Sequence, residues 1–242
     1  LTESGNLLLE HCERILEDYK RLEYEMHLLH NEYTGGLKLG ASTTIAQYVL
    51  PPLLASFIGK FPQVSLSLLN GNSREIEAAL QEHRIDLGFV EGVFRLPNIR
   101  YTTFLEDELV AVVRTGSKLA VGEEITPDEL FHLPLVLRER GSGTLDVFER
   151  ALQQHNIKLS SLQVLMYLGS TESIKLFLEH TDCLGIVSVR SITRELYSGQ
   201  LRVVEIKGMP MLRDFSFAQP QGQESGLAQV FMQFAMHNNH KL

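Results

Sequence analysis

The sequence predicts an α/β protein with two similar lobes, each built on a mainly parallel sheet, and a long helix in front of them. Two observations support this fold class. Segments with strand and helix spacing alternate along most of the chain, which is typical of right-handed crossovers between parallel strands. Predicted strands begin near residues 37, 64 and 85, and again near residues 134, 162 and 183. This repeated spacing indicates two lobes of the same βαβαβ plan.

The composition is that of a globular protein that does not hold DNA phosphates by itself. The chain has 242 residues, of which 44% are hydrophobic and 21% are charged. Its 30 acidic and 22 basic side chains give a formal net charge of −8, whereas non-specific affinity for nucleic acids needs clustered Lys and Arg.

The sequence shows no sign of export or of a metal site. The two cysteines, Cys12 and Cys183, lie too far apart in the sequence to suggest a disulfide framework or a thiolate metal site. No apolar run approaches the roughly 20 residues that span a bilayer, and the amino-terminal segment is too charged for a secretory signal. We therefore expect a cytoplasmic protein without a metal or another cofactor.

The first element is predicted to be a dimerisation helix over residues 1–34. Its apolar or near-apolar positions alternate at intervals of four and three residues, which is the spacing of a heptad seam. The seam consists of Leu8, Cys12, Ile15, Tyr19, Leu22, Met26, Leu29 and Tyr33. A second copy of the chain is the simplest partner for this seam. The alternative is an ordinary amphipathic helix packed on its own domain.

The first lobe follows a Gly35-Gly36 joint. A strand from Leu37 leads into helical spacing near residues 44–60, interrupted at Pro51 and Pro52. A strand from residue 64, a helix near 73–83 and a strand from residue 85 complete the pattern.

Two connections between the lobes are predicted. A strand at 108–114 leads out of the first lobe, and a strand near 212–218 with a helix near 224–236 leads back to it. The predicted lobes therefore comprise residues 35–114 with 209–242 (lobe I) and residues 115–208 (lobe II). Two crossings of this kind form a hinged cleft, which is a usual place for a small ligand.

Small polar residues follow several strands in both predicted lobes. The candidate segments are Ser42, Thr43 and Thr44; residues 70–73; Glu91-Gly92; residues 138–144; and Gly169, Ser170 and Thr171. Hydroxyl groups and glycines at helix starts leave backbone N–H donors uncovered, which suits a carboxylate or a group of sulfate size. The alternative at each position is a helix cap or a turn.

Catalytic interpretations find less support. The Gly-Ser-Gly at 141–143 lacks the nucleophile-turn pattern, and the nine histidines show no metal-ligand spacing. Phosphate-loop and dinucleotide fingerprints are absent from the sequence. We therefore predict a binding protein and not an enzyme.

Several motifs resemble those of LysR-type transcriptional regulators. Residues 1–10 look like the junction between wing and linker helix in that family. The segment from Leu39-Gly-Ala-Ser-Thr-Thr44 to Phe61-Pro-Gln-Val64 is similar to the start of its effector-binding domain. Similar matches are Asp86-Leu-Gly-Phe89, the run at 133–144, and Cys183-Leu-Gly-Ile-Val187. The order and spacing of these motifs cover essentially the whole chain.

The resemblance implies a fold, a function and a site. The fold would be two Rossmann-like lobes resembling periplasmic binding proteins, with a small effector in the cleft and homo-oligomers formed partly through linker helices. DNA would be bound only through an amino-terminal winged helix-turn-helix outside this chain. The effector contacts carried over from the family would be Ser42, Thr43, Thr44, Glu91, Gly169, Ser170 and Thr171.

Glu91 departs from the family pattern, because members that bind inorganic anions have a hydroxyl residue there. A carboxylate would repel an anion, so Glu91 favours an effector with an ammonium or hydroxyl group, such as an amino-acid derivative. Alternatively, Glu91 points to solvent or pairs with an arginine. A solute receptor of a transport system remains the alternative function.

Overall fold

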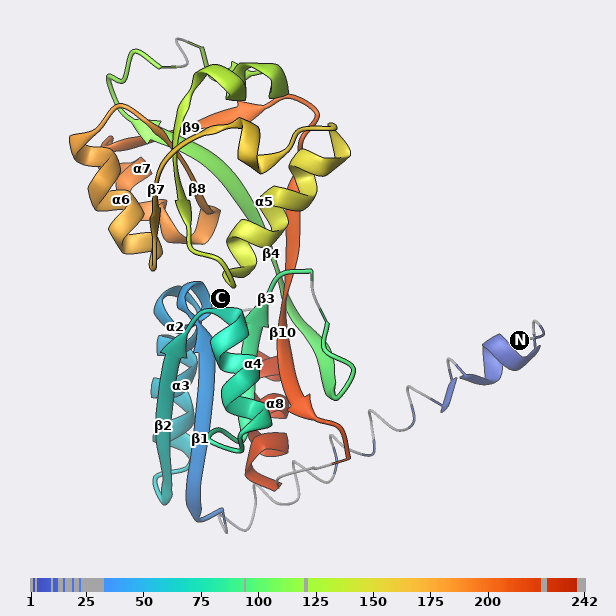
Figure 1. The fold of residues 1–242 in the computed structure, drawn as a ribbon. Coiled ribbons are helices and arrows are strands. Elements are labelled where there is room, and N and C mark those ends of the chain that lie inside the picture. The colour runs from blue at the N-terminus through green and yellow to red at the C-terminus, as the bar shows by residue number, and fades with distance from the viewer. Residues whose placement is uncertain are drawn as a thin grey trace.

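The structure consists of two α/β lobes connected by two long strands (Figure 1). It is a computed structural model that describes residues 33–93, 95–119, 122–222 and 226–238, together with residues 2, 4–9, 11, 12, 15, 19 and 22. In Figure 1 the lobe containing β1, β2 and β3 lies below the lobe containing β7, β8 and β9. The two-lobed α/β class predicted from the sequence is confirmed.

Lobe I is built around three parallel strands: β1 (Gly35–Ser42), β2 (Val64–Gly71) and β3 (Leu87–Glu91). Its helices are α2 (Thr43–Tyr48), α3 (Leu50–Lys60), α4 (Ser73–Gln81) and α8 (Gly226–Asn238). Phe57 of α3 packs against Phe231 and Phe234 of α8, with ring centroids 4.8 and 5.2 Å apart. These contacts attach the carboxyl-terminal helix to lobe I.

Lobe II repeats the plan with the parallel strands β6 (Pro134–Arg138), β7 (Gln163–Leu168) and β8 (Leu184–Ser188). Its helices are α5 (Gly143–Gln154), α6 (Thr171–His180) and α7 (Thr193–Ser198). The strand β9 (Leu201–Ile206) pairs with β4 and with the short β5 (Glu124–Ile125). Three short 3₁₀ helices lie at Pro127–His132, Leu159–Ser161 and Val189–Ser191.

The strands β4 (Ile99–Arg114) and β10 (Met211–Pro220) run antiparallel to each other and join the lobes. They lie at the centre of one sheet with the order β2-β1-β3-β10-β4-β8-β6-β7. The hydrophobic cores on either side of the connection are separate, because Phe104 and Phe215 belong to the lobe I core while Leu109 and Met211 belong to the lobe II core. The domain limits assigned above stay a prediction.

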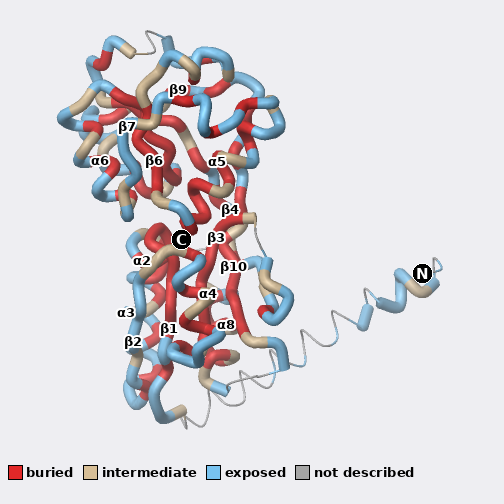
Figure 2. The backbone as a smooth tube through the Cα atoms, in the orientation of Figure 1, coloured by how far each residue is buried: buried red, intermediate tan, exposed pale blue. Residues whose placement is uncertain are grey.

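The described part of the amino-terminal segment is helical, at residues 4–9, 11, 12, 15, 19 and 22. Its seam side chains are exposed on the single chain: Leu8 by 65%, Ile15 by 66%, Tyr19 by 59% and Leu22 by 57%, and Cys12 is also exposed. Figure 2 shows this helical segment well away from the buried cores of the lobes. These side chains do not pack on the chain's own lobes. Tyr33, the last position of the predicted seam, lies outside the helix and is half-buried against the lobe I core, with its ring centroid 5.6 Å from that of Phe61. The seam prediction is therefore wrong at Tyr33.

Met26 and Leu29 lie outside the described residues. No helix in the described ranges combines the length and the apolar character needed to cross a membrane.

Candidate functional site

The carboxyl end of β1 lies at the contact between the lobes. Ser42, Thr43 and Thr44 are 1%, 5% and 0% exposed. The Thr43 hydroxyl donates a hydrogen bond to the Gly71 carbonyl at 3.2 Å and accepts one from Nη2 of Arg138 at 3.3 Å. Thr43, the first residue of α2, therefore links lobe I directly to β6 of lobe II. The Ser42 hydroxyl makes no capping bond to α2 and has no hydrogen-bond partner.

Arg138 is the cation of this contact, and it is 2% exposed. Its Nε and Nη2 donate to the Glu139 carboxylate at 2.8 and 3.1 Å, and Nη2 also donates to the Gly169 carbonyl at 3.3 Å. Its Nη1 is buried without a partner. A buried donor left unpaired costs about 1–3 kcal/mol, and more when the group is charged. Arg138 therefore has unused capacity to bind an acceptor.

Glu91 ends β3 and is 4% exposed. Its Oε1 lies 3.1 Å from Nη1 of Arg213 and accepts hydrogen bonds from the hydroxyls of Thr44 and Thr144, both at 3.4 Å. Its Oε2 is buried without a partner. Of the alternatives that the sequence left open, pairing with an arginine is the one present in the structure. Arg213 compensates the negative charge, while one carboxylate oxygen remains a free acceptor.

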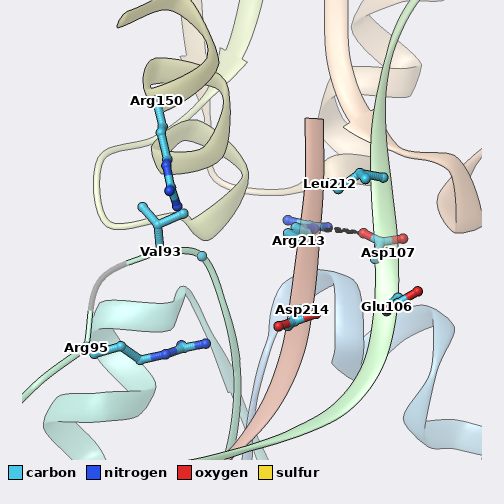
Figure 3. A pocket seen from close by; sticks show the side chains of 9 residues that line it. Val93, Arg95, Glu106, Asp107, Arg150, Leu212, Arg213 and Asp214 are labelled. Carbon is cyan, nitrogen blue, oxygen red and sulfur yellow. Dashed lines mark hydrogen bonds and ion pairs between the residues drawn. The ribbon is translucent and has the colours of Figure 1, made fainter. Parts of the chain in front are cut away.

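Arg213 continues this network into the connecting strands. Its Nε and Nη2 both lie 2.7 Å from Oδ2 of Asp107, and its Nη1 donates to the Thr144 hydroxyl at 3.0 Å. The Ser188 hydroxyl donates to Oδ1 of Asp107 at 2.7 Å. The network thus joins β3, both connecting strands and lobe II in the buried interior. Figure 3 shows the Arg213–Asp107 pair between β10 and β4.

The start of α5 lies against the end of β3. A Cβ atom built on Gly143 would lie 2.3 Å from the Glu91 carbonyl oxygen and 2.6 Å from its Cγ. No side chain fits in this space. Gly143 is therefore needed to bring lobe II into contact with Glu91.

Tyr48 of α2 makes a second connection between the lobes. Its hydroxyl donates to the Glu172 carboxylate of α6. Lys175 lies 2.8 Å from Glu172 and 2.7 Å from Glu195, and donates to the Ser191 carbonyl at 2.9 Å. Burial, followed by the hydrogen bond to Glu172, raises the pKa of Tyr48, so the phenol stays a neutral donor.

Several of the other polar segments singled out in the sequence act as helix caps. The Ser170 hydroxyl accepts a hydrogen bond from the Ser173 N–H at 3.1 Å, and the Ser142 hydroxyl accepts one from the Thr144 N–H at 3.2 Å. Asn72 forms a capping box with Glu75. Gly169 contributes its carbonyl to Arg138, and Thr171 is 1% exposed at the start of α6.

Arg138 and Arg213 are the main residues that the sequence reasoning did not identify. Arg138 falls within a segment that was singled out for its glycines and hydroxyls. Arg213 lies in a predicted strand, next to Asp214 and outside the segments rich in hydroxyls and glycines. An arginine inside an apolar strand is a recognisable signal, because a buried charge needs a partner.

A pocket of about 330 Å³ lies beside the connecting strands, and the Asp107–Arg213 pair of this network forms part of its lining (Figure 3). Arg95 approaches it from lobe I and Arg150 from α5 of lobe II, with Glu106 and Asp214 on the strands. Arg95 also donates to the Ser216 hydroxyl and stacks on Tyr101.

The described residues contain no group of three or more His, Cys, Asp or Glu side chains that could hold a metal ion. Cys183 is buried, and burial raises the pKa of its thiol to about 11. The protonated thiol is therefore the favoured form at neutral pH.

Comparison with known families gives a direct match: residues 30–239 fit the model of the LysR substrate binding domain. The chain belongs to this family. The regulator YeiE of Escherichia coli K12 is 34% identical to it over 206 residues, which cover 85% of this chain and 68% of YeiE. The HTH-type transcriptional regulator CysL of Bacillus subtilis is 26% identical over 216 residues, covering 89% of this chain and 71% of CysL.

Solved LysR-type structures share the fold. The regulatory domain of CcmR from Synechocystis PCC6803, solved in complex with 2-PG, superposes with a TM-score of 0.76 and 28% identity, covering 84% of this chain and 97% of that one. The cofactor-binding domain of the Cbl regulator has a TM-score of 0.74 at 19% identity, covering 85% and 89% of the two chains. These relatives confirm the LysR resemblance and give no support to a transport receptor. The family is one of transcriptional regulators and not of enzymes.

Proposed function

We propose that this chain is the regulatory part of a LysR-type transcriptional regulator and that it binds a small-molecule effector between its two lobes. One observation carries the proposal. Buried polar side chains from both lobes meet at the ends of β1, β3 and β6, and three of their atoms have no partner: Oγ of Ser42, Oε2 of Glu91 and Nη1 of Arg138. An effector that satisfies these atoms bonds to both lobes at once.

Such a ligand acts by preferring one arrangement of the lobes. Direct contacts between the lobes at Thr43–Arg138 and Tyr48–Glu172 compete with contacts to a ligand. A ligand changes the balance of two arrangements only through its different affinity for each. The connecting strands β4 and β10 are the elements that can carry this change from one lobe to the other.

The other partners follow from the family. The CbnR regulator has been solved in full length with its target DNA, and we propose that this chain likewise reaches DNA through a winged helix-turn-helix domain and works in the cytoplasm. The exposed seam at Leu8, Ile15, Tyr19 and Leu22 is proposed to pair with a second copy in a dimer or tetramer.

Native mass spectrometry after incubation with a metabolite extract tests effector binding. The wild-type chain is expected to retain a small molecule that the Arg138→Leu variant does not retain, while Arg84→Leu, at an exposed position of lobe I, behaves as wild type. Equal retention by wild type and Arg138→Leu, or no retained molecule at all, contradicts the proposal.

A further inference from the structure

The atoms without partners differ in what they can accept or donate, and this difference restricts the ligand. Nη1 of Arg138 can only donate, and it is charged. Oε2 of Glu91 can only accept while the carboxylate is ionised. Oγ of Ser42 can do either. The three side chains are 2%, 4% and 1% exposed, so bulk water does not satisfy these atoms.

These groups lie in one small region at the contact between the lobes. Arg138 is hydrogen-bonded to Thr43, which is the neighbour of Ser42 in the chain. Thr44, the next residue, donates to the other oxygen of Glu91. These bonds place Arg138, Ser42 and Glu91 around the adjacent residues Thr43 and Thr44.

The local charges are nearly balanced before any ligand binds. Arg138 is paired with Glu139, and Glu91 is paired with Arg213. Arg213 is shared with Asp107, which also lies 3.6 Å from Nε of Arg190. Because no large excess of positive charge is present, the site suits a ligand of low net charge and not a polyanion.

We propose that the effector carries an oxyanion group and, next to it, an O–H or N–H donor. The oxyanion binds Nη1 of Arg138 and the Ser42 hydroxyl, and the donor is bound by Oε2 of Glu91. Hydroxy acids, amino acids and oxyanions that keep a proton belong to this class. Anions that bring only acceptors are rejected, because two acceptors would then face each other in a buried site. This inference rests on the proposed function and adds the chemistry of the ligand.

Two matched pairs of probes test the inference by isothermal titration on the 242-residue chain at pH 7. Phosphate keeps a proton at this pH and sulfate of the same shape does not; glycolate has a hydroxyl and acetate does not. The wild-type chain is expected to bind phosphate and glycolate at least tenfold more tightly than sulfate and acetate. Equal binding within either pair overturns the inference, and so does binding of none of the four probes.

Variants identify the residue that distinguishes probes with an O–H donor from probes without one. Glu91→Gln places an amide N–H where Oε2 accepts, so the preference within each pair should disappear or reverse. Glu91→Asp retains an acceptor and serves as a second variant if Glu91→Gln does not fold. Its shorter side chain should reduce the preference without reversing it. Glu205→Gln, at an exposed position of β9, is the control. An unchanged preference in a folded Glu91→Gln variant overturns the assignment of Glu91.

Failure of this inference can be distinguished from failure of the proposed function. Retention of an extract metabolite that has no donor next to its anion, or that has no anion, overturns the ligand chemistry and leaves effector binding intact. Arg138→Leu should abolish binding of all four probes. Wild-type affinity for the probes in that variant overturns the role of Arg138.

Discussion

Replacing Arg213 by Met should be among the most damaging single changes in the buried interior. The Arg213 side chain is 1% exposed, and its guanidinium lies 2.7 Å from Asp107, 3.1 Å from Glu91 and 3.0 Å from the Thr144 hydroxyl. Methionine fills much of the volume but leaves both carboxylates without this cation. Removing one partner of a buried pair costs about 3–5 kcal/mol. Since 1 kcal/mol corresponds to about 2–4 °C for a domain of this size, Tm should fall by roughly 6–20 °C.

Urea unfolding and calorimetry of four chains measure this effect: wild type, Arg213→Met, Asp107→Asn and the double variant. The double variant should lose less stability than the two single variants added together, because Asp107→Asn removes one of the charges that Arg213→Met leaves unpaired. The control is Arg84→Met, whose side chain is 54% exposed beside Glu82 and should cost less than about 1 kcal/mol. A cost for Arg213→Met as small as that of Arg84→Met would refute the reasoning.

Three further changes test other parts of the structure. Gly143→Ala should lower the free energy of unfolding in urea by about 1–3 kcal/mol, since its Cβ would overlap Glu91. Gly59→Ala in α3, with open space around its Cβ, should raise this free energy by about 0.5–1 kcal/mol. A loss of stability at both positions would contradict the steric argument. Burial raises the pKa of Asp146 from 3.8 to about 6. The folded chain therefore binds more protons than the unfolded chain between these values, and its stability falls as pH rises from about 4 to 6. Asp146→Asn should remove this fall in urea titrations across that pH range, and an unchanged dependence of stability on pH would contradict the assignment to Asp146. Leu22→Asp should dissociate the seam and halve the mass measured by light scattering if the wild type is a dimer, whereas an unchanged mass would show that the seam does not hold the copies together.

Much of the fold was predictable because the parallel strands are short, apolar and bounded by clear turn signals. β3 and β8 are buried at every position. Each is the third strand of the βαβαβ pattern in its own lobe. The two connecting strands were harder to predict. β4 is 16 residues long, but the part over residues 99–108 mixes exposed, half-buried and buried side chains and includes the charged residues 106–108. Only residues 108–114, which are mainly apolar, gave a strand signal.

β9 was missed for a related reason. It pairs with the second half of β4 and the two-residue β5, and partly buried Arg202 and exposed Glu205 interrupt its apolar run. An edge strand of this kind depends on its neighbours, which local spacing does not reveal.

The candidate site was found only in part. The hydroxyl run at 42–44 and Glu91 were identified because they follow apolar strands. Their charged partners are far away in the sequence. Arg138 follows its partner Thr43 by 95 positions, and Arg213 follows its partner Glu91 by 122 positions. Whether Glu91 repels an anion depends on Arg213, and that pairing exists only in the folded chain. Local sequence patterns do not contain this information.

Hydrogen exchange with the bound metabolite tests most directly whether the effector lies between the lobes. Adding the molecule retained from the extract should slow amide exchange at residues 42–44 and 138–144 together, because a ligand held by both lobes must protect segments of each. Protection confined to one lobe, or confined to the pocket beside Arg95 and Arg150, would contradict binding at this contact.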